Sequence, residues 1–200
     1  MESSKIHLSD AEKELVLNAE IILTKNRIVR KAIELLAVLQ EHMVQASLLP
    51  ITLPSTSPKI SRGENYRGLP YAILDYPRIS HDNSICFIRT MFWWGHFFSS
   101  TLHLSGLYAQ QAQDVLAVSY EPLRQREFFT GIGSDPWVHH FDGDHYVAMS
   151  DLTPGAFAGT LQGEHIKLAA KWPLTLWEAS LPQLLESWKF LGGLITQSVK

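Results

Sequence analysis

The stretch RTMFWWGHFFSSTLHLSG, residues 89–106, restricts the fold more than any other part of the chain. After Arg89 the chain carries no Asp, Glu, Lys or Arg until Asp114. A membrane-spanning helix needs about 20 mostly apolar residues, and here serine, threonine and histidine interrupt the apolar run. The isoleucine, phenylalanine, threonine and tryptophan around position 90 favour strands. We therefore expect a β-hairpin of a soluble protein and no association with a membrane.

Gly95 and His96 stand at the centre of this hairpin. A glycine in first place is typical of a two-residue type II′ turn. Because side chains alternate along a strand, this register places Arg89 on the core face. Trp94 and His103 lie together on the opposite face, where they could form the wall of a pocket for a planar molecule.

Residues 1–46 are the predicted helical N-terminal segment, in which the helical pattern itself begins at residue 8. Ser9 and Glu12 match the S-x-x-E capping box, apolar residues recur at helical spacing, and no Gly or Pro occurs before Pro50. The length favours two helices with a bend near residues 24–27. The apolar stripe either packs on a sheet or mediates self-association with a second copy.

A proline-rich connector is predicted over residues 47–70. Proline fixes φ and removes a backbone donor, so neither a helix nor a central strand is expected there. The prolines of this segment are Pro50, Pro54, Pro58 and Pro70.

Strand patterns alternate with short helices in the remaining residues, 71–200. A strand is expected over 71–79, and Pro77 indicates that it ends there or lies at an edge. Two short helices are expected over 106–129, a type I′ hairpin at Asp142-Gly143, and a strand pair around Gln162-Gly163. The last element expected is a C-terminal helix with a capping box at Ser180 and Gln183. The fold class is therefore α+β. We predict a mostly antiparallel sheet of about six strands in a single domain, with an N-terminal helical pair, short inserted helices and a C-terminal helix packed on it.

Composition excludes some classes of function. A net charge of −3 gives no basis for binding nucleic acid. Basic residues cluster only over 25–31, which we interpret as a solvated helix face. Cys86 is the single cysteine, so the chain can form neither an internal disulfide nor a cysteine-based zinc site. Residues 1–14 lack the pattern of a signal peptide, and a cytoplasmic location is the expectation.

Histidines make the first candidate site. His140 and His145 face each other across the predicted 142–143 hairpin and could hold a divalent metal, with His103 or His165 as a further ligand. The alternative is an exposed polar hairpin tip.

Arginines make the second candidate site. Arg89, inside an apolar run, needs a partner, and Asp75 is the one available on the preceding strand. The pair is either structural, or Arg89 forms an anion clamp at a pocket floor. Arg62 and Arg67 lie in a glycine-containing loop that either binds an anion or docks on the surface through Tyr66.

Three functions follow from these patterns. The first is a module that binds a small anionic or planar molecule. The second is a metal-dependent enzyme using His140 and His145, and the third is an assembly protein that oligomerises through its N-terminal helices. None of the common catalytic or nucleotide-binding motifs is present, so the sequence specifies neither a reaction nor a cofactor. The ligand-binding residues predicted are Arg62, Arg67, Arg89, Trp94 and His103.

Overall fold

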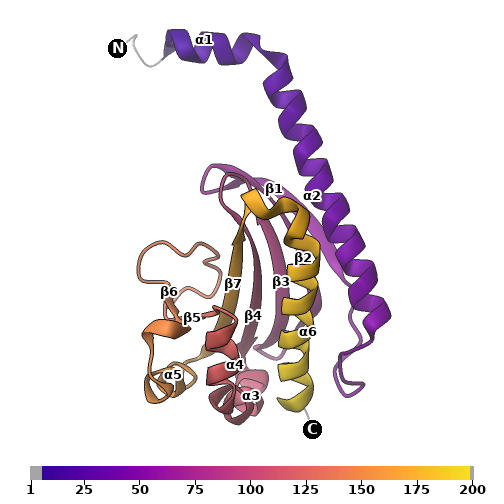
Figure 1. Ribbon diagram of the computed structural model, residues 1–200, viewed down its shortest axis with the longest axis vertical. Helices are drawn as coiled ribbons and strands as arrows, with labels where there is room; N and C mark the ends of the chain where they lie inside the picture. Colours follow the sequence, from indigo (N-terminus) through magenta and orange to yellow (C-terminus); the bar gives the residue numbers. More distant parts are fainter. Residues whose placement is uncertain (1–5, 199–200) are drawn as a thin grey trace.

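A computed structural model describes residues 6–198 of the chain, and its centre is a seven-stranded antiparallel sheet (Figure 1). The α+β class is confirmed, including the N-terminal helical pair, the inserted helices and the C-terminal helix. The strands, in the spatial order β1-β2-β3-β4-β7-β5-β6, are β1 (Lys59–Tyr66), β2 (Leu69–His81), β3 (Ser84–Trp93), β4 (Phe97–Ser105), β7 (His165–Pro173), β5 (Phe129–Gly131) and β6 (Tyr146–Ala148).

The helices are α1 (Asp10–Leu17), α2 (Ala19–Ala46), α3 (Gly106–Val118), α4 (Tyr120–Gln125), α5 (Pro154–Thr160) and α6 (Ser180–Ser198). One face of the sheet packs against α2, α3 and α6, and the main hydrophobic core lies between them. The predicted stripe of α6 is buried there, with Leu184 and Trp188 at its centre. Trp188 also donates its indole N–H to the Tyr76 carbonyl at 2.8 Å.

The N-terminal helices separate at Asn18 rather than near residues 24–27. Asn18 has non-helical backbone angles, and its side chain accepts a hydrogen bond from the Glu20 N–H, so it ends α1 and caps α2. The Ser9–Glu12 capping box is confirmed. Figure 1 shows α1 and the first turns of α2 extending beyond the sheet. Residues 1–5 of the predicted helical segment lie outside the described residues.

The predicted connector over 47–70 contains a strand, β1, which is a correction to the sequence analysis. No proline occurs between Pro58 and Pro70, which belongs to β2, and β1 pairs with β2 along one side only, as an edge strand does. Arg67 and Gly68 both have positive φ and form a tight turn that joins β1 to β2. Two positive φ angles in succession are the geometry of a type I′ hairpin.

The β3–β4 hairpin is present, but its register is shifted by one residue. The turn contains Trp94, Gly95 and His96, because the His96 N–H donates to the Trp93 carbonyl at 3.1 Å and Gly95 takes the positive φ of +74°. Since strand side chains alternate, a slip of one residue exchanges the faces on one strand relative to the other. Arg89 and His103 therefore lie on the same face, and Trp94 packs with the core on the helix side.

Three further local predictions are wrong. The hairpin at Asp142-Gly143 is replaced by an irregular loop, and β6 pairs with β5 instead. The first strand of the expected pair around Gln162-Gly163 is helix α5. The Ser180 hydroxyl donates to the Leu176 carbonyl and does not cap α6. Among residues 6–198, none of the helices is long and apolar enough to cross a bilayer.

Candidate functional site

The sheet face opposite the helices carries a set of polar side chains that strand pairing brings side by side. Asp75 on β2 is paired with Arg89 on β3, and His103 on β4 is paired with Lys167 on β7. Paired residues in antiparallel strands project to the same face. These four residues lie on four consecutive strands of the sheet, so the proximity of their side chains depends on the register of all four strands.

The positive charge of Arg89 is compensated by Asp75, and a further donor of its guanidinium is engaged by His139. Its Nε and Nη2 atoms donate to the two carboxylate oxygens of Asp75 at 2.7 and 2.8 Å, and Nη1 lies 2.9 Å from His139 Nε2. Because a guanidinium can only donate, His139 Nε2 is the acceptor. Burial, together with the charges of Lys167 and Arg89, holds the pKa of His139 well below its usual value, which agrees with a neutral ring.

A loop over residues 132–145 crosses this face and is fastened by polar contacts. The Tyr66 hydroxyl accepts from the His139 N–H at 2.7 Å and lies 3.0 Å from His140 Nδ1. The buried Lys167 ammonium donates to the Val138 carbonyl. Burial is also the main reason that the pKa of Lys167 falls to about 8. Polar anchors thus hold the loop on the sheet.

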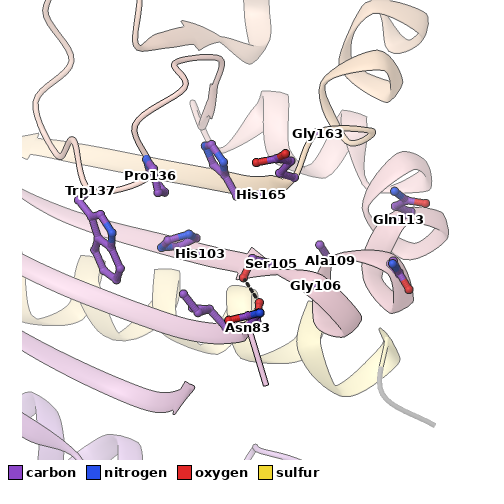
Figure 2. Close-up of a pocket in the computed structure, with 13 residues that line it drawn as sticks. Asn83, His103, Ser105, Gly106, Ala109, Gln113, Pro136, Trp137, Gly163 and His165 are labelled. Carbon is purple, nitrogen blue, oxygen red and sulfur yellow. Dashed lines mark hydrogen bonds between the residues drawn. The ribbon is translucent and has the colours of Figure 1, made fainter. Parts of the chain in front are cut away.

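A cavity of about 470 Å³ opens where this loop, the sheet and α3 meet (Figure 2). This volume is within the range of small-molecule sites. Figure 2 shows the rings of Trp137, His103 and His165 gathered around one part of the cavity and the side chain of Gln113 in another. The lining residues are Asn83, Ile85, His103, Ser105, Gly106, Ala109, Gln110, Gln113, Pro136, Trp137, Gly163, Glu164 and His165.

His103 is the buried polar group of this cavity. Its residue is 4% exposed, and its Nε2 atom has no hydrogen-bond partner among the described residues. Burial lowers the pKa of His103 to about 3, helped by the charges of Lys167 and His165. The imidazole is therefore neutral near pH 7. A buried polar atom left without a partner is destabilising.

Aromatic groups surround His103. The Trp137 ring lies 5.4 Å from the His103 ring in an edge-to-face arrangement, and His165 lies 6.0 Å away. Trp137 comes from the 132–145 loop and is 48% exposed. A large aromatic side chain that remains half exposed beside a cavity offers its free surface for stacking.

Gly106 begins α3, the helix that forms one wall of the cavity, and makes the direct connection from β4 possible. It has a φ of +56°, and a Cβ at this position would lie 2.6 Å from the Ser84 hydroxyl oxygen. That hydroxyl accepts from the Leu107 N–H at 3.1 Å. The chain can therefore turn directly from β4 into α3, which places Gln113 across from the sheet.

The structure does not bring the five predicted ligand-binding residues together. Arg62 is exposed on β1, and Arg67 is exposed and paired with Asp142 at 2.7 Å. Arg89 is engaged by Asp75 as described, which confirms the predicted partner. Trp94 lies on the helix side of the sheet. Of the five, only His103 lines the cavity.

The predicted metal ligands His140 and His145 are close, with ring centroids 5.0 Å apart. The Tyr66 hydroxyl already occupies one nitrogen of His140, and the nearby Asp142 carboxylate pairs with Arg67. Within residues 6–198, no three His, Cys, Asp or Glu side chains are grouped closely enough to hold a metal ion.

Sequence reasoning missed Trp137 and Lys167. Lys167 has the same signal as Arg89, a cation inside an apolar strand, and that signal could have been used. Trp137 has no such signal, because its position depends on how the 132–145 loop crosses the sheet. No known protein family, curated protein or solved structure matches this chain.

Proposed function

We propose that this protein binds a small planar molecule in the cavity lined by His103, Trp137 and His165. The observation that carries the proposal is the buried His103 Nε2, which lacks a hydrogen-bond partner within the described chain and belongs to a residue that lines the cavity. Because Nε2 is closed to solvent, the His103 ring would have to rotate to turn this atom toward the cavity. A ligand that then offers Nε2 a complementary polar atom would satisfy it, and the ring of the ligand would stack on the exposed face of Trp137.

The geometry supports a planar ligand better than an anionic one. Arg62 and Arg67 are exposed away from the cavity lining, and the charge of Arg89 is compensated by Asp75. The neutral state of His103 adds no positive charge, and Glu164 contributes a carboxylate to the lining. We therefore propose an uncharged heteroaromatic compound as the ligand class.

A fragment experiment tests this proposal. The probes are uncharged heteroaromatic compounds such as indole, quinoline and benzimidazole, and binding is read by saturation-transfer NMR. His103→Leu removes the polar partner, and Gln110→Trp fills the cavity from an exposed position on α3. Both variants should abolish the signal of compounds that bind the wild type, whereas His81→Ala, at an exposed position outside the cavity, should retain it.

Two results would contradict the proposal. One is the absence of binding by any compound of the set. The other is binding that survives both His103→Leu and Gln110→Trp, because it would place the compounds elsewhere. Melting curves of each variant show whether the fold is intact.

A second candidate function is assembly with another copy of the chain. It is favoured by the large apolar side chains that α1 and the first turns of α2 expose, among them Leu15, Ile22 and Leu23. We also keep a cytoplasmic location within the proposal, supported by the count of one cysteine, which is too few for the disulfides typical of small secreted domains.

A further inference from the structure

The segment over residues 6–31, here called the N-terminal arm, has an unusual concentration of exposed apolar side chains. Of the 17 exposed large hydrophobic residues in the described chain, eight lie within residues 6–23. Ile6 and Leu8 precede α1, and the other six lie on α1 and the first turns of α2, which extend beyond the sheet in Figure 1. Short helices in water gain little stability without packing, so the arm needs a surface that covers these exposed apolar side chains.

Charge divides the arm into two halves. Residues 10–20 carry four acidic side chains and one basic side chain, whereas residues 25–31 carry four basic side chains and no acidic one. The acidic residues are Asp10, Glu12, Glu14 and Glu20, and the basic ones of the second half are Lys25, Arg27, Arg30 and Lys31. Within one chain Lys25 already pairs with Glu64, Arg27 with Glu20, and Asp10 with Lys13. The charges of the arm that form no ion pair among the described residues are those of Glu12 and Glu14 in the first half and of Arg30 and Lys31 in the second, and these are complementary when the arm is reversed.

We infer that two copies of the chain associate through their N-terminal arms in antiparallel orientation, with residues 10–20 of each copy against residues 25–31 of the other. This inference rests on the proposed self-association and names its partner and its geometry. A twofold axis would pass near Ile21 and Ile22, which are exposed and apolar. Such an interface uses the same surface of both copies, which is the usual arrangement in a symmetric dimer.

A parallel arrangement is disfavoured by the same charges. It would place the acidic halves side by side and the basic halves side by side, and juxtaposed like charges are costly. The break at Asn18 suits the antiparallel arrangement, because it sets α1 at an angle to α2, as Figure 1 shows. Each α1 can then lie across the first turns of the α2 of the other copy.

Sedimentation of the full-length protein tests whether the arm forms a dimer. The wild type should show a concentration-dependent dimer, and Leu15→Glu with Ile22→Glu should abolish it. Arg30→Glu with Lys31→Glu should weaken the dimer about tenfold or more at low salt, less so at high salt. Arg78→Glu with Lys189→Glu makes the same change in net charge on the body and should leave the dimer intact.

Cross-linking tests the orientation. Leu15→Cys and Asn26→Cys chains are mixed and treated with a bis-maleimide, while the native Cys86 is buried and its pKa is raised to about 12 by that burial. The mixture should give the heterodimer, and neither chain alone should cross-link as well. Val118→Cys, exposed on α3, is the control for random collision.

The outcomes separate the two proposals. A strict monomer at high concentration would overturn the self-association itself. A dimer insensitive to the arm substitutions would place the interface elsewhere. A dimer in which Leu15→Cys cross-links most efficiently with itself would keep the self-association and overturn the antiparallel orientation.

Discussion

Asp75 and Arg89 form a bidentate ion pair between neighbouring strands, with Arg89 Nε and Nη2 at 2.7 and 2.8 Å from the two carboxylate oxygens. The side chains are 6% and 17% exposed, respectively. The remaining Arg89 donor, Nη1, reaches His139 of the loop over residues 132–145. The pair thus connects the centre of the sheet to the loop that borders the cavity.

Replacing Asp75 by alanine should lower the free energy of unfolding by about 3 kcal/mol, because removal of one partner leaves a largely buried guanidinium uncompensated. Urea denaturation measures this change. The exposed pair Arg67–Asp142 is the matched control, and Arg67→Ala should cost less than about 1 kcal/mol. Equal effects of the two substitutions would show that burial of the Asp75–Arg89 pair does not determine its contribution.

The neutral state of His103 should make stability depend on pH. Its pKa in the folded protein is about 3, whereas an unfolded histidine has a pKa of about 6.5. As the pH falls below about 6.5, the unfolded chain takes up a proton that folded His103 does not, so stability decreases toward pH 3. The contribution of this residue is at most about 1.4 kcal/mol per pH unit in that window.

Urea denaturation at several pH values between 4 and 7 checks this dependence. His103→Gln should show a shallower loss of stability with decreasing pH than the wild type, and Gln110→Ala, which alters an uncharged residue of the same cavity, should retain the wild-type slope. Identical slopes for His103→Gln and the wild type would contradict the neutral buried imidazole.

Gly106→Ala should destabilise the protein by about 2 kcal/mol or more, since the substituted residue would have both an unfavourable positive φ and a Cβ too close to Ser84 Oγ. Gly159→Ala is the control, because a Cβ there meets no atom within 4 Å and α5 gains a better helix former. Thermal denaturation should therefore shift in opposite directions for the two variants. A Gly106→Ala protein as stable as the wild type would mean that α3 does not begin as described.

Tyr66→Phe should loosen the loop over residues 132–145. The substitution removes the acceptor of the His139 N–H and the hydroxyl beside His140, at a cost of about 1–2 kcal/mol. Hydrogen exchange of residues 137–141 should become faster, while exchange in β3 and β4 stays unchanged. Tyr71→Phe is the control, and a loop equally protected in both variants would rule out Tyr66 as its anchor.

Much of the architecture could be predicted from local patterns. The capping box at Ser9 and Glu12 and the apolar stripe around Trp188 specify helices without reference to the rest of the chain. Alternation around Ile88 and Phe98 specifies strands in the same way. Propensity and periodicity are properties of neighbouring residues, so they determine the type of element and hence the α+β class.

The site could not be predicted in the same way, because it depends on alignment between distant segments. A two-residue turn and a three-residue turn at Gly95 differ little in sequence, yet the choice decides whether Arg89 and His103 share a face. Arg67–Gly68 forms a tight turn that the expected pattern of Asn-Gly or Asp-Gly did not indicate.

The sequence by itself determined the helical N-terminus, the antiparallel sheet and the need of Arg89 for Asp75, since burial of a charge demands a partner wherever the charge lies. Only the tertiary structure decided that His103 is buried beside a cavity with Trp137 and His165. Those three residues come from a strand, an irregular loop and another strand. They meet because the register of β4 with β7 and the path of the loop are fixed by packing over the whole sheet.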